Sequence, residues 1–486
     1  MITTSDVSRD VAAAARSFGA FPDALAAAND LALNYLRTLD DRPVGRAATV
    51  AEMVAALDEP LPETGCPPAD AVAEWFHRAE PGIVASSGPR FFGFVHGGTT
   101  PAALAGDWLA SALDQNAGLW AMSPAAAQTE LTVLRWLKEL FGLPPHWEGA
   151  VTSGATMANL VGLAAARQWA GRRLGFDPAQ DGLGGHPAIP IVSSSEIHAS
   201  AVKALGTLGF GRGAIHRVAA TGGVIDLAAF DRTLADIRGP VIVVGNAGEV
   251  NTGAFDDLNA LADRCAAHPG GAWLHVDGAF GLFAAASPRF AHLTRGAELA
   301  DSVASDAHKW LNVPYDGGFA FVRDGDSLRA AFDATGSYLA AAPGAGYNPL
   351  SHVPEMSRRF RALSFWCALR ADGRNGYRSM VEQCVDNARS FADWIEGTPE
   401  LELLAPAHLN IVCFRFHPTG VPAVGLDALN RDANAALQAG GDVFVSPTVW
   451  DGKAAIRAAF DNWATRPSDV ERLCDAVARQ LDHVSP

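Results

Sequence analysis

The chain has 486 residues, with 53 aspartates and glutamates against 37 lysines and arginines, so its formal net charge at pH 7 is −16. Hydrophobic residues make up 49% of the chain and charged residues 19%, a balance that predicts a globular protein and excludes wholesale disorder. The acidic excess argues against a nucleic-acid partner, and the length fits about three domains or one large α/β unit with appendages.

The first 86 residues have the pattern of helices interrupted by a proline-rich break. Ala and Leu recur at helical spacing on both sides of the run EPLPETGCPP. We therefore expect a helical N-terminal segment over residues 1–86. Its start lacks a basic stretch followed by an apolar core, so no signal peptide is expected, and no apolar run approaches the roughly 18 residues that cross a bilayer.

From about residue 148 short Val- and Ile-rich runs alternate with Ala- and Leu-rich helical stretches. The runs AIPIVSSS, IHRVAA and VIVVGNA are each followed by a helical pattern, and AWLHVDGAF, ADSVASDAH and GGFAFVRD come later. Apolar strands that alternate with crossover helices predict a mainly parallel sheet covered on both faces. We expect this large α/β domain to span residues 87–375.

After residue 375 the pattern changes again. A long helical stretch, GYRSMVEQCVDNARSFADWI, leads into LNIVCFRF, GDVFVSPTV and AAIRAAF, and a last helix follows. This order predicts a small α+β C-terminal domain over residues 376–486. The six cysteines of the whole chain lie far apart without a Cys-x-x-Cys pair, which is typical of reduced thiols in a cytoplasm rather than of disulfides or a zinc site.

Two of the expected strands are followed by small polar residues at the start of a helix. The segment Thr152-Ser153-Gly154-Ala155-Thr156 can expose free backbone N–H groups that cradle an anion or a phosphate, and the alternative is a simple helix cap by Ser153 or Thr156. His198 follows Ser193-Ser194-Ser195 at the head of the next helix. Its imidazole can stack on a planar ring or move protons, or it can be an ordinary capping or core histidine.

Two further strands end in charged residues. Asp277 ends the apolar run LHVD, where a carboxylate is costly to bury without a cation, unless it is an exposed turn residue. The small Ala279 after it would let a flat ligand lie close. Lys309 stands between His308 and Trp310; a partly desolvated lysine has a lowered pKa and can form a Schiff base, while a strand-end lysine can also simply reach solvent.

Together these four segments meet the needs of one cofactor, pyridoxal 5′-phosphate (PLP). PLP requires a lysine for a Schiff base, a carboxylate for its pyridine nitrogen, a phosphate cradle and a flat partner for its ring. Lys309 and Asp277 are about one strand–helix–strand excursion apart, so both can lie at the same edge of a parallel sheet.

The order Thr-Ser-Gly-Ala-Thr, His, His-Val-Asp-x-Ala and Asp-Ala-His-Lys-Trp resembles the group II PLP-dependent amino-acid decarboxylases, which act on aromatic amino acids, tyrosine, histidine or glutamate. Three more stretches of the chain resemble segments of that family: Pro89–Phe94, Trp120–Leu131 and Ser357–Leu363. The resemblance covers roughly residues 85 to 470, and the His-Lys-Trp block is its most specific part. It implies an aspartate-aminotransferase-like α/β fold of type I, with a mostly parallel seven-stranded sheet and a cytoplasmic homodimer whose subunits share active sites. The segment 1–86 would then serve dimerisation.

The resemblance also assigns roles to single residues. Lys309 would bind the cofactor covalently, Asp277 would pair with the pyridinium nitrogen, and His198 would stack on the ring and take part in catalysis. Ala279 would pack on the other ring face, and the phosphate would be held by Gly154, Ala155, Thr156 and His308. Tyr338 matches the tyrosine of a mobile loop, which protonates the α-carbon after carbon dioxide leaves. No metal is implied.

The expected substrate is an L-amino acid, and aromatic residues suggest its kind. Phe91, Phe92, Phe94 and Trp120 can line a pocket for an aromatic amino acid, or they can be core or subunit contacts. A dicarboxylic substrate would need an extra cation, for which Arg90 or His96 could serve.

The chain departs from the family where many members carry two threonines. Glu249 and Val250 stand there, so the threonine's role is vacant or is taken by Asn246 or Thr252.

Other activities also stay open from the sequence. Carbon–carbon cleavage and transamination use the same cofactor, and a cofactor-free scaffold would lack any activity. A nicotinamide-dependent oxidoreductase is a rival of another class, because Gly209–Ala214 matches Gly-x-Gly-x-x-Ala. That segment, however, follows a helix and precedes a strand, the reverse of a dinucleotide-binding loop.

Overall fold

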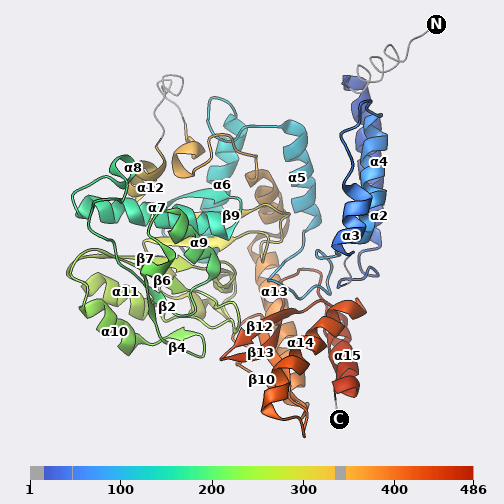
Figure 1. The fold of residues 1–486 in the computed structure, drawn as a ribbon. Helices are drawn as coiled ribbons and strands as arrows, with labels where there is room; N and C mark the ends of the chain where they lie inside the picture. Colours follow the sequence, from blue (N-terminus) through green and yellow to red (C-terminus); the bar gives the residue numbers. More distant parts are fainter. Residues whose placement is uncertain (1–15, 46–47, 334–345, 485–486) are drawn as a thin grey trace.

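The Val- and Ile-rich runs form one seven-stranded sheet at the centre of the large unit (Figure 1). The computed structural model describes residues 16–45, 48–333 and 346–484. The strands are β1 (Glu148–Thr152), β2 (Ile191–Ser194), β3 (Ile215–Val218), β6 (Val241–Asn246), β7 (Ala272–Asp277), β8 (Ser302–Asp306) and β9 (Gly318–Val322). Their order is β1-β9-β8-β7-β6-β2-β3, and only β9 runs antiparallel to its neighbours. The mostly parallel seven-stranded sheet is thereby confirmed.

Alternating side chains of these strands enter two separate cores, because a strand turns successive residues to opposite faces. On β6, Ile242 and Val244 pack in the core beneath α7 (Ala155–Arg173) and α9 (Ala199–Thr207), while Val243 packs in the core with α10 and α11. The helices beside the sheet are α6 (Pro124–Phe141), α8 (Pro178–Asp181), α10 (Leu227–Ala235), α11 (Leu258–Ala267) and α12 (Gly325–Phe332), with the small hairpin β4 (Ala220–Thr221) and β5 (Val224–Ile225). Helices on both faces leave the carboxyl ends of the strands as the accessible edge.

A second sheet forms the C-terminal part of the molecule. Helix α13 (Ala362–Glu396) leads into β10 (Leu401–Leu403), β11 (Ile411–Phe416), β12 (Ser446–Trp450) and β13 (Lys453–Ala459), which pair antiparallel in the order β10-β11-β13-β12. Two helices, α14 (Ala423–Gly440) and α15 (Pro467–Val484), pack beside this sheet (Figure 1). Helix α13 is broken at Gly373, where φ is 59° and ψ is −176°, and the division between residues 375 and 376 stays a prediction.

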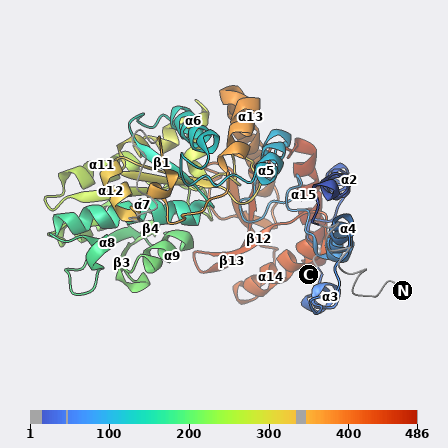
Figure 2. The ribbon, with the colours of Figure 1, turned by 90° about the horizontal axis from the view of Figure 1, so that it is seen from above.

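The N-terminal helices stand apart from the large sheet in both ribbon views (Figures 1 and 2). They are α2 (Phe21–Arg37), α3 (Val50–Leu57) and α4 (Pro68–Ala79), and we call them the arm; α5 (Pro101–Leu113) follows on the body. No residue of α2 is buried, although its sequence is amphipathic. Apolar side chains of the arm, such as Leu25 and Trp75, are therefore left exposed.

Candidate active site

The polar residues predicted at strand ends meet at one edge of the large sheet. Asn246 ends β6 and lies opposite Asp277, which ends the neighbouring β7. Asp306 ends β8 next to it, and Thr152 ends β1. Parallel strands bring their carboxyl ends to a common edge, which is where ligands bind in open α/β sheets.

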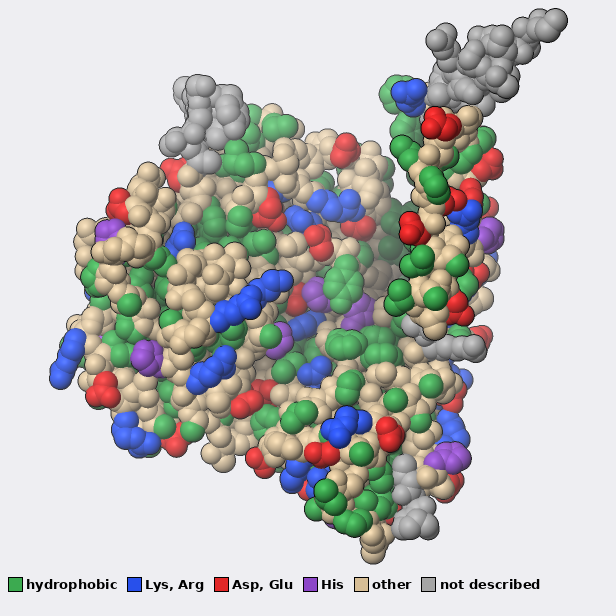
Figure 3. Space-filling model, in the orientation of Figure 1, with side chains coloured by type: hydrophobic (Ala, Val, Ile, Leu, Met, Phe, Trp, Pro, Cys, Tyr) green, Lys and Arg blue, Asp and Glu red, His purple; other side chains and the backbone are tan. Residues whose placement is uncertain are grey.

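A narrow cavity at this edge gathers four of the residues that the sequence singled out. Lys309, Asp277, His198 and Ala279 all line it; its full lining is Glu196, His198, Asn246, Gly248, Glu249, Val250, Asp277, Ala279, Phe280 and Lys309. Histidine and hydrophobic side chains also gather at a hollow near the middle of one face of the molecule (Figure 3). The Lys309 side chain is 11% exposed, and its Nζ lies 3.7 Å from Asp306 Oδ2. Lys309 is thus a mostly desolvated amine with an acidic neighbour.

Asp277 is buried and held by donors on both of its oxygens. Asn159 on α7 donates from Nδ2 to Asp277 Oδ2 at 2.9 Å, and the Ala279 backbone N–H donates to Oδ1 at 3.1 Å. Asn159 Oδ1 lies 2.8 Å from Nε2 of the fully buried His275, whose Nδ1 pairs with Ser302 Oγ. Each Asp277 oxygen keeps a lone pair for one more donor. This network fixes the direction in which the carboxylate can accept it.

His198 both caps a helix and faces the cavity. Its Nδ1 accepts from the Ser200 backbone N–H at 3.2 Å and pairs with Ser200 Oγ at 2.7 Å, so the capping role considered from the sequence is present. Burial is the main cause that lowers the pKa of the imidazole. A neutral ring at physiological pH can lie against a planar ligand without adding charge, so capping and stacking are compatible.

The start of α7 has no side-chain cap, so neither Ser153 nor Thr156 closes it. Gly154, with φ of 151°, precedes the helix, and a Cβ built there would lie 3.4 Å from Asp306 Oδ1 and 3.7 Å from His308 Cε1. Thr156 is exposed and Ala155 is buried. The Ala155 N–H donates to Asp306 Oδ1 at 2.8 Å. Backbone N–H groups at a helix start, together with a nearby histidine, match the donors that hold a phosphate. The sequence did not single out Asp306, although it begins the Asp-Ala-His-Lys-Trp block.

Tyr315 contacts both His96 and His308, and no sequence pattern singled it out as a site residue. Tyr315 Oη lies 2.8 Å from His96 Nδ1, and its ring centroid lies 4.2 Å from that of His308. Burial is the main cause that lowers the pKa of His96 and of His308 to about 4. His96 is therefore neutral at physiological pH and does not supply the cation that a dicarboxylic substrate would need.

The departure at Glu249 has a local explanation. Glu249 Oε1 accepts from the Asn251 backbone N–H, and Oε2 accepts from the Thr252 N–H at 2.9 Å and the Thr252 hydroxyl at 3.0 Å. Thr252 is therefore occupied within its own loop. Asn246 Nδ2, in contrast, is buried without a hydrogen-bond partner among the described residues, and Asn246 lines the cavity. Of the two candidates, Asn246 is the one with a free donor for a ligand.

The aromatic residues proposed for the substrate lie in different surroundings. Phe91 stacks on Phe444 with ring centroids 4.5 Å apart, and Phe94 is 64% exposed beside the same ring. Phe92 is 1% exposed and packs against Phe460 in the core. Trp120 is partly buried. None of the four lines the cavity around Lys309 in the part of the chain that the structure describes.

Arg90 is used to hold the arm. Its guanidinium donates to the backbone carbonyls of Asp40 and Arg42 at 2.8 Å each and also to that of Asp442. With these carbonyls as acceptors, Arg90 is committed to the backbone and does not face a substrate.

A buried ion pair joins two of the segments that resemble the family, Trp120–Leu131 and Ser357–Leu363. Arg358 donates through both terminal nitrogens to Glu130, at 3.0 and 3.1 Å, and the two side chains are 1% and 2% exposed. Glu130 Oε1 also accepts from the Val151 N–H at 3.0 Å, directly before the start of α7. The pair thus ties α6 and the chain before α13 to the end of β1.

Some expectations fall outside this geometry. Tyr338 lies outside the described residues. The segment Gly209–Ala214 lies between α9 and β3, as the sequence indicated, and not between a strand and a helix. Within residues 16–45, 48–333 and 346–484 no cluster of His, Cys, Asp and Glu could hold a metal ion, and no helix there is long and apolar enough to cross a membrane. The six cysteines are free thiols.

The comparisons with known proteins agree with this geometry. Residues 52–417 match the pyridoxal-dependent decarboxylase conserved domain. The chain is 28% identical to an aromatic-L-amino-acid decarboxylase of Bacillus atrophaeus, over 94% of each chain, and 31% identical to an L-2,4-diaminobutyrate decarboxylase of Rhizobium meliloti, over 88% of this chain and 86% of the relative. The fold superposes on Oryza sativa TDC crystallised with PLP and tryptamine with a TM-score of 0.90, at 26% identity over 97% of this chain and 99% of that one.

Proposed function

The chain belongs to the pyridoxal-dependent decarboxylase family, and we propose that it converts an aromatic L-amino acid to the amine and carbon dioxide. Membership makes it an amino-acid decarboxylase that uses PLP. The observation that carries the proposal is the convergence of Lys309, Asp277, His198 and Ala279 on one cavity. The aromatic substrate is supported by the relatives from Bacillus atrophaeus and Oryza sativa.

The residues present fit the cofactor. The unpartnered amide nitrogen of Asn246 is a free donor, and the start of α7, where the Ala155 N–H already binds the Asp306 carboxylate, is a place where backbone N–H groups hold an oxyanion. Lys309 would hold PLP covalently, Asp277 would accept from its pyridine nitrogen, and His308 would join the α7 N–H groups at the phosphate. When bound, PLP supplies an electron sink for the electrons released as the α-carboxylate leaves.

The protein's own groups decide which bond breaks and where protons go. The carboxylate of Asp277, oriented by Asn159, would stabilise a proton on the pyridine nitrogen, and the neutral His198 would pack against the ring. Lys309 would be the amine in the cavity that holds the cofactor when no substrate is bound. Tyr338 would give its proton to the α-carbon, so a Tyr338→Phe enzyme should divert product toward the aldehyde.

Carbon dioxide release from a panel of amino acids tests the proposal. Tyrosine, tryptophan and phenylalanine should give carbon dioxide and the amine in equal amounts, well above glutamate. A ketoacid or a cleaved side-chain fragment in place of carbon dioxide would contradict decarboxylation. Carbon dioxide released only from non-aromatic substrates would contradict the aromatic assignment and leave the decarboxylase intact.

A diamino acid is the second candidate substrate, and a buried acid favours it. Asp461 is buried outside the lining of the cavity, and the backbone N–H of His96 and the charges of Lys309 and Arg457 act on its carboxyl group. The 31% identical relative decarboxylates L-2,4-diaminobutyrate by its name. Including 2,4-diaminobutyrate in the panel, with Asp461→Asn as the matched variant, separates the two. Under the aromatic proposal, that variant should not change the substrate order.

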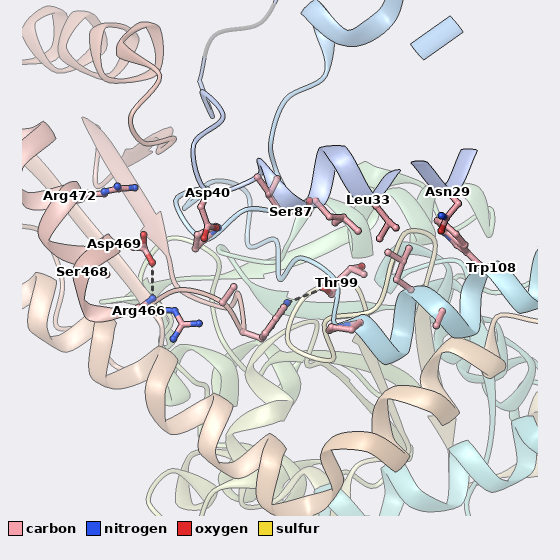
Figure 4. Close-up of a pocket in the computed structure, with 18 residues that line it drawn as sticks. Asn29, Leu33, Asp40, Ser87, Thr99, Trp108, Arg466, Ser468, Asp469 and Arg472 are labelled. Carbon is pink, nitrogen blue, oxygen red and sulfur yellow. Dashed lines mark hydrogen bonds between the residues drawn. The ribbon is translucent and has the colours of Figure 1, made fainter. Parts of the chain in front are cut away.

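We also infer a cytoplasmic homodimer. A cavity of about 660 Å³ opens between α2, α5 and the start of α15, and Leu33 and Trp108 line it (Figure 4). Trp108 is 42% exposed, and Leu109 and Leu113 beside it are also exposed. A second copy of the chain would cover these apolar side chains and the arm. The free cysteines support a reducing compartment.

Sedimentation tests the dimer. Trp108→Glu should shift the protein toward monomer, because it places a charge in the apolar interface. Val424→Glu serves as the control, since Val424 is 91% exposed on α14, outside the arm and α5. A wild-type protein that sediments as a monomer would overturn the inference.

A further inference from the structure

A carboxylate occupies the helix start where an anion is expected to bind. Asp306 Oδ1 accepts from the Ala155 backbone N–H at 2.8 Å, at the first residue of α7. Helix α7 has no cap of its own, so Asp306, from the end of β8, takes that position. Gly318 allows the close approach, because a Cβ there would lie within 3 Å of the Gly154 backbone. The favourable dipole of the helix start is thus already matched by a negative group.

The surroundings of Asp306 contain both signs of charge. Lys309 Nζ lies 3.7 Å from Oδ2 and His308 Nδ1 lies 3.2 Å from Oδ1, both from the chain after β8, and Tyr315 also lies within its field. Asp277 on β7 and His198 at α9 act on the same carboxyl group. Burial is the main cause that raises the pKa of Asp306 to about 6. The carboxyl group of Asp306 therefore changes its charge near pH 6.

A phosphate bound to the same N–H groups would meet this carboxylate at close range. A phosphate monoester is close to doubly charged at pH 7, and two buried anions side by side repel strongly. We propose that Asp306 takes up one proton when the cofactor phosphate binds at the start of α7, so that its carboxyl group acts as a donor to the phosphate. This inference rests on the phosphate position proposed above, at Gly154, Ala155, Thr156 and His308.

The consequence is a cofactor affinity that depends on pH through Asp306. Below about pH 6 the group already carries its proton, so binding requires none. Above that value binding must take a proton from solution, and the affinity falls by up to about tenfold for each pH unit until the pKa of the bound state is passed. A neutral amide at position 306 removes this dependence because it donates at every pH.

The test measures binding of pyridoxamine 5′-phosphate and pyridoxamine to the full chain freed of cofactor, by quenching of tryptophan fluorescence between pH 5 and 8.5. Neither probe can form a Schiff base with Lys309, so the amine does not enter the result. Asp306→Asn is the variant. Asp256→Asn is the matched control, because Asp256 is also buried with a pKa of about 6 but accepts from the backbone N–H groups of Ile225 and Asn246 instead.

The expected result is a ratio of dissociation constants, wild type over Asp306→Asn, that is flat below pH 6 and then rises about tenfold per pH unit. The phosphate's own titration cancels in this ratio. Asp256→Asn should keep the pH dependence of wild type. A ratio that stays constant with pH would overturn the inference, since Asp306 would then be a plain hydrogen-bond acceptor.

Two further measurements distinguish an incorrect phosphate site from an incorrect role for Asp306. If pyridoxamine 5′-phosphate binds no more tightly than pyridoxamine, the proposed phosphate site is wrong, whatever Asp306 does. If Asp306→Asn does not fold, calorimetry of wild type in two buffers of different ionisation enthalpy decides. Uptake of about one proton with the phosphorylated probe only, at pH 7.5, supports the inference, and no uptake overturns it.

Discussion

Asn159 offers the sharpest test of how the fold prepares Asp277. Asn159→Ala removes the 2.9 Å hydrogen bond to Asp277 Oδ2 and leaves Nε2 of the buried His275 without its partner. A hydrogen bond to a charged group contributes about 1.5–3 kcal/mol, so cofactor affinity should fall by about ten- to a hundredfold. Asn159→Asp should be worse, because it places a second carboxylate against Asp277 in a buried site.

The assay is a spectral titration of PLP into the cofactor-free protein, followed by kcat and KM with the best substrate. We expect the loss in cofactor affinity and kcat, with KM nearly unchanged, because Asn159 acts on the amino-acid site only through Asp277. If Asn159 had only a structural role, Asn159→Ala would lower the melting temperature without lowering cofactor affinity and kcat selectively.

Asn430 provides the control. It is equally buried and makes three hydrogen bonds within the C-terminal unit, to Phe416 and Leu426. Asn430→Ala should therefore lower the melting temperature and leave cofactor affinity as in wild type. If Asn159→Ala binds PLP as tightly as wild type, Asn159 does not orient Asp277 and the reasoning fails.

Three more predictions follow from single contacts. Lys309→Ala should abolish both activity and the visible absorbance band of the bound cofactor; a yellow, active variant would remove Lys309 from its role. Arg358→Met should destabilise the protein by about 3–5 kcal/mol, because it strands the buried Glu130 carboxylate, and Arg358→Met with Glu130→Leu should recover part of that loss in thermal melts. Burial raises the pKa of Asp461 from 3.8 to about 7. Between these two pH values the folded chain keeps a proton on Asp461 that the unfolded chain has released. The free energy of unfolding therefore falls as the pH rises from about 4 to about 7. Asp461→Asn should then gain melting temperature over wild type at pH 8 more than at pH 5, and an equal gain at both would refute the assignment.

Much of the fold follows from local pattern. The alternation of apolar runs and helical stretches predicted the parallel sheet, because each run of Val and Ile has few ways to be buried other than as a central strand. The breaks at the strand ends likewise placed Asp277 and Lys309 at one edge. The helical stretch expected after residue 375 corresponds to the part of α13 beyond Gly373, where the backbone leaves the helical conformation with φ of 59° and ψ of −176°.

The arm shows where pattern alone gives an incomplete answer. The sequence predicts amphipathic helices over residues 1–86, and α2, α3 and α4 form there. What their apolar faces contact cannot be read from periodicity, because a helix shows the same spacing whether its partner is its own chain or another. The family resemblance implies a homodimer, and the structure adds that these apolar faces are exposed in the single chain, where a second copy could cover them.

The sequence by itself determined which chemistry the chain carries. Along the chain, a helix start, a histidine, an aspartate and a lysine follow one another in the order that the family shows. Only the tertiary structure decided how these groups are held. Asn159 is an ordinary residue of a helix until the fold brings it to Asp277, 118 residues away, and Asp306 meets Ala155 across 151 residues. Such contacts depend on how strands and helices pack, which no local spacing encodes. The groups that orient Asp277 and compete for the phosphate position are therefore visible only in the folded molecule.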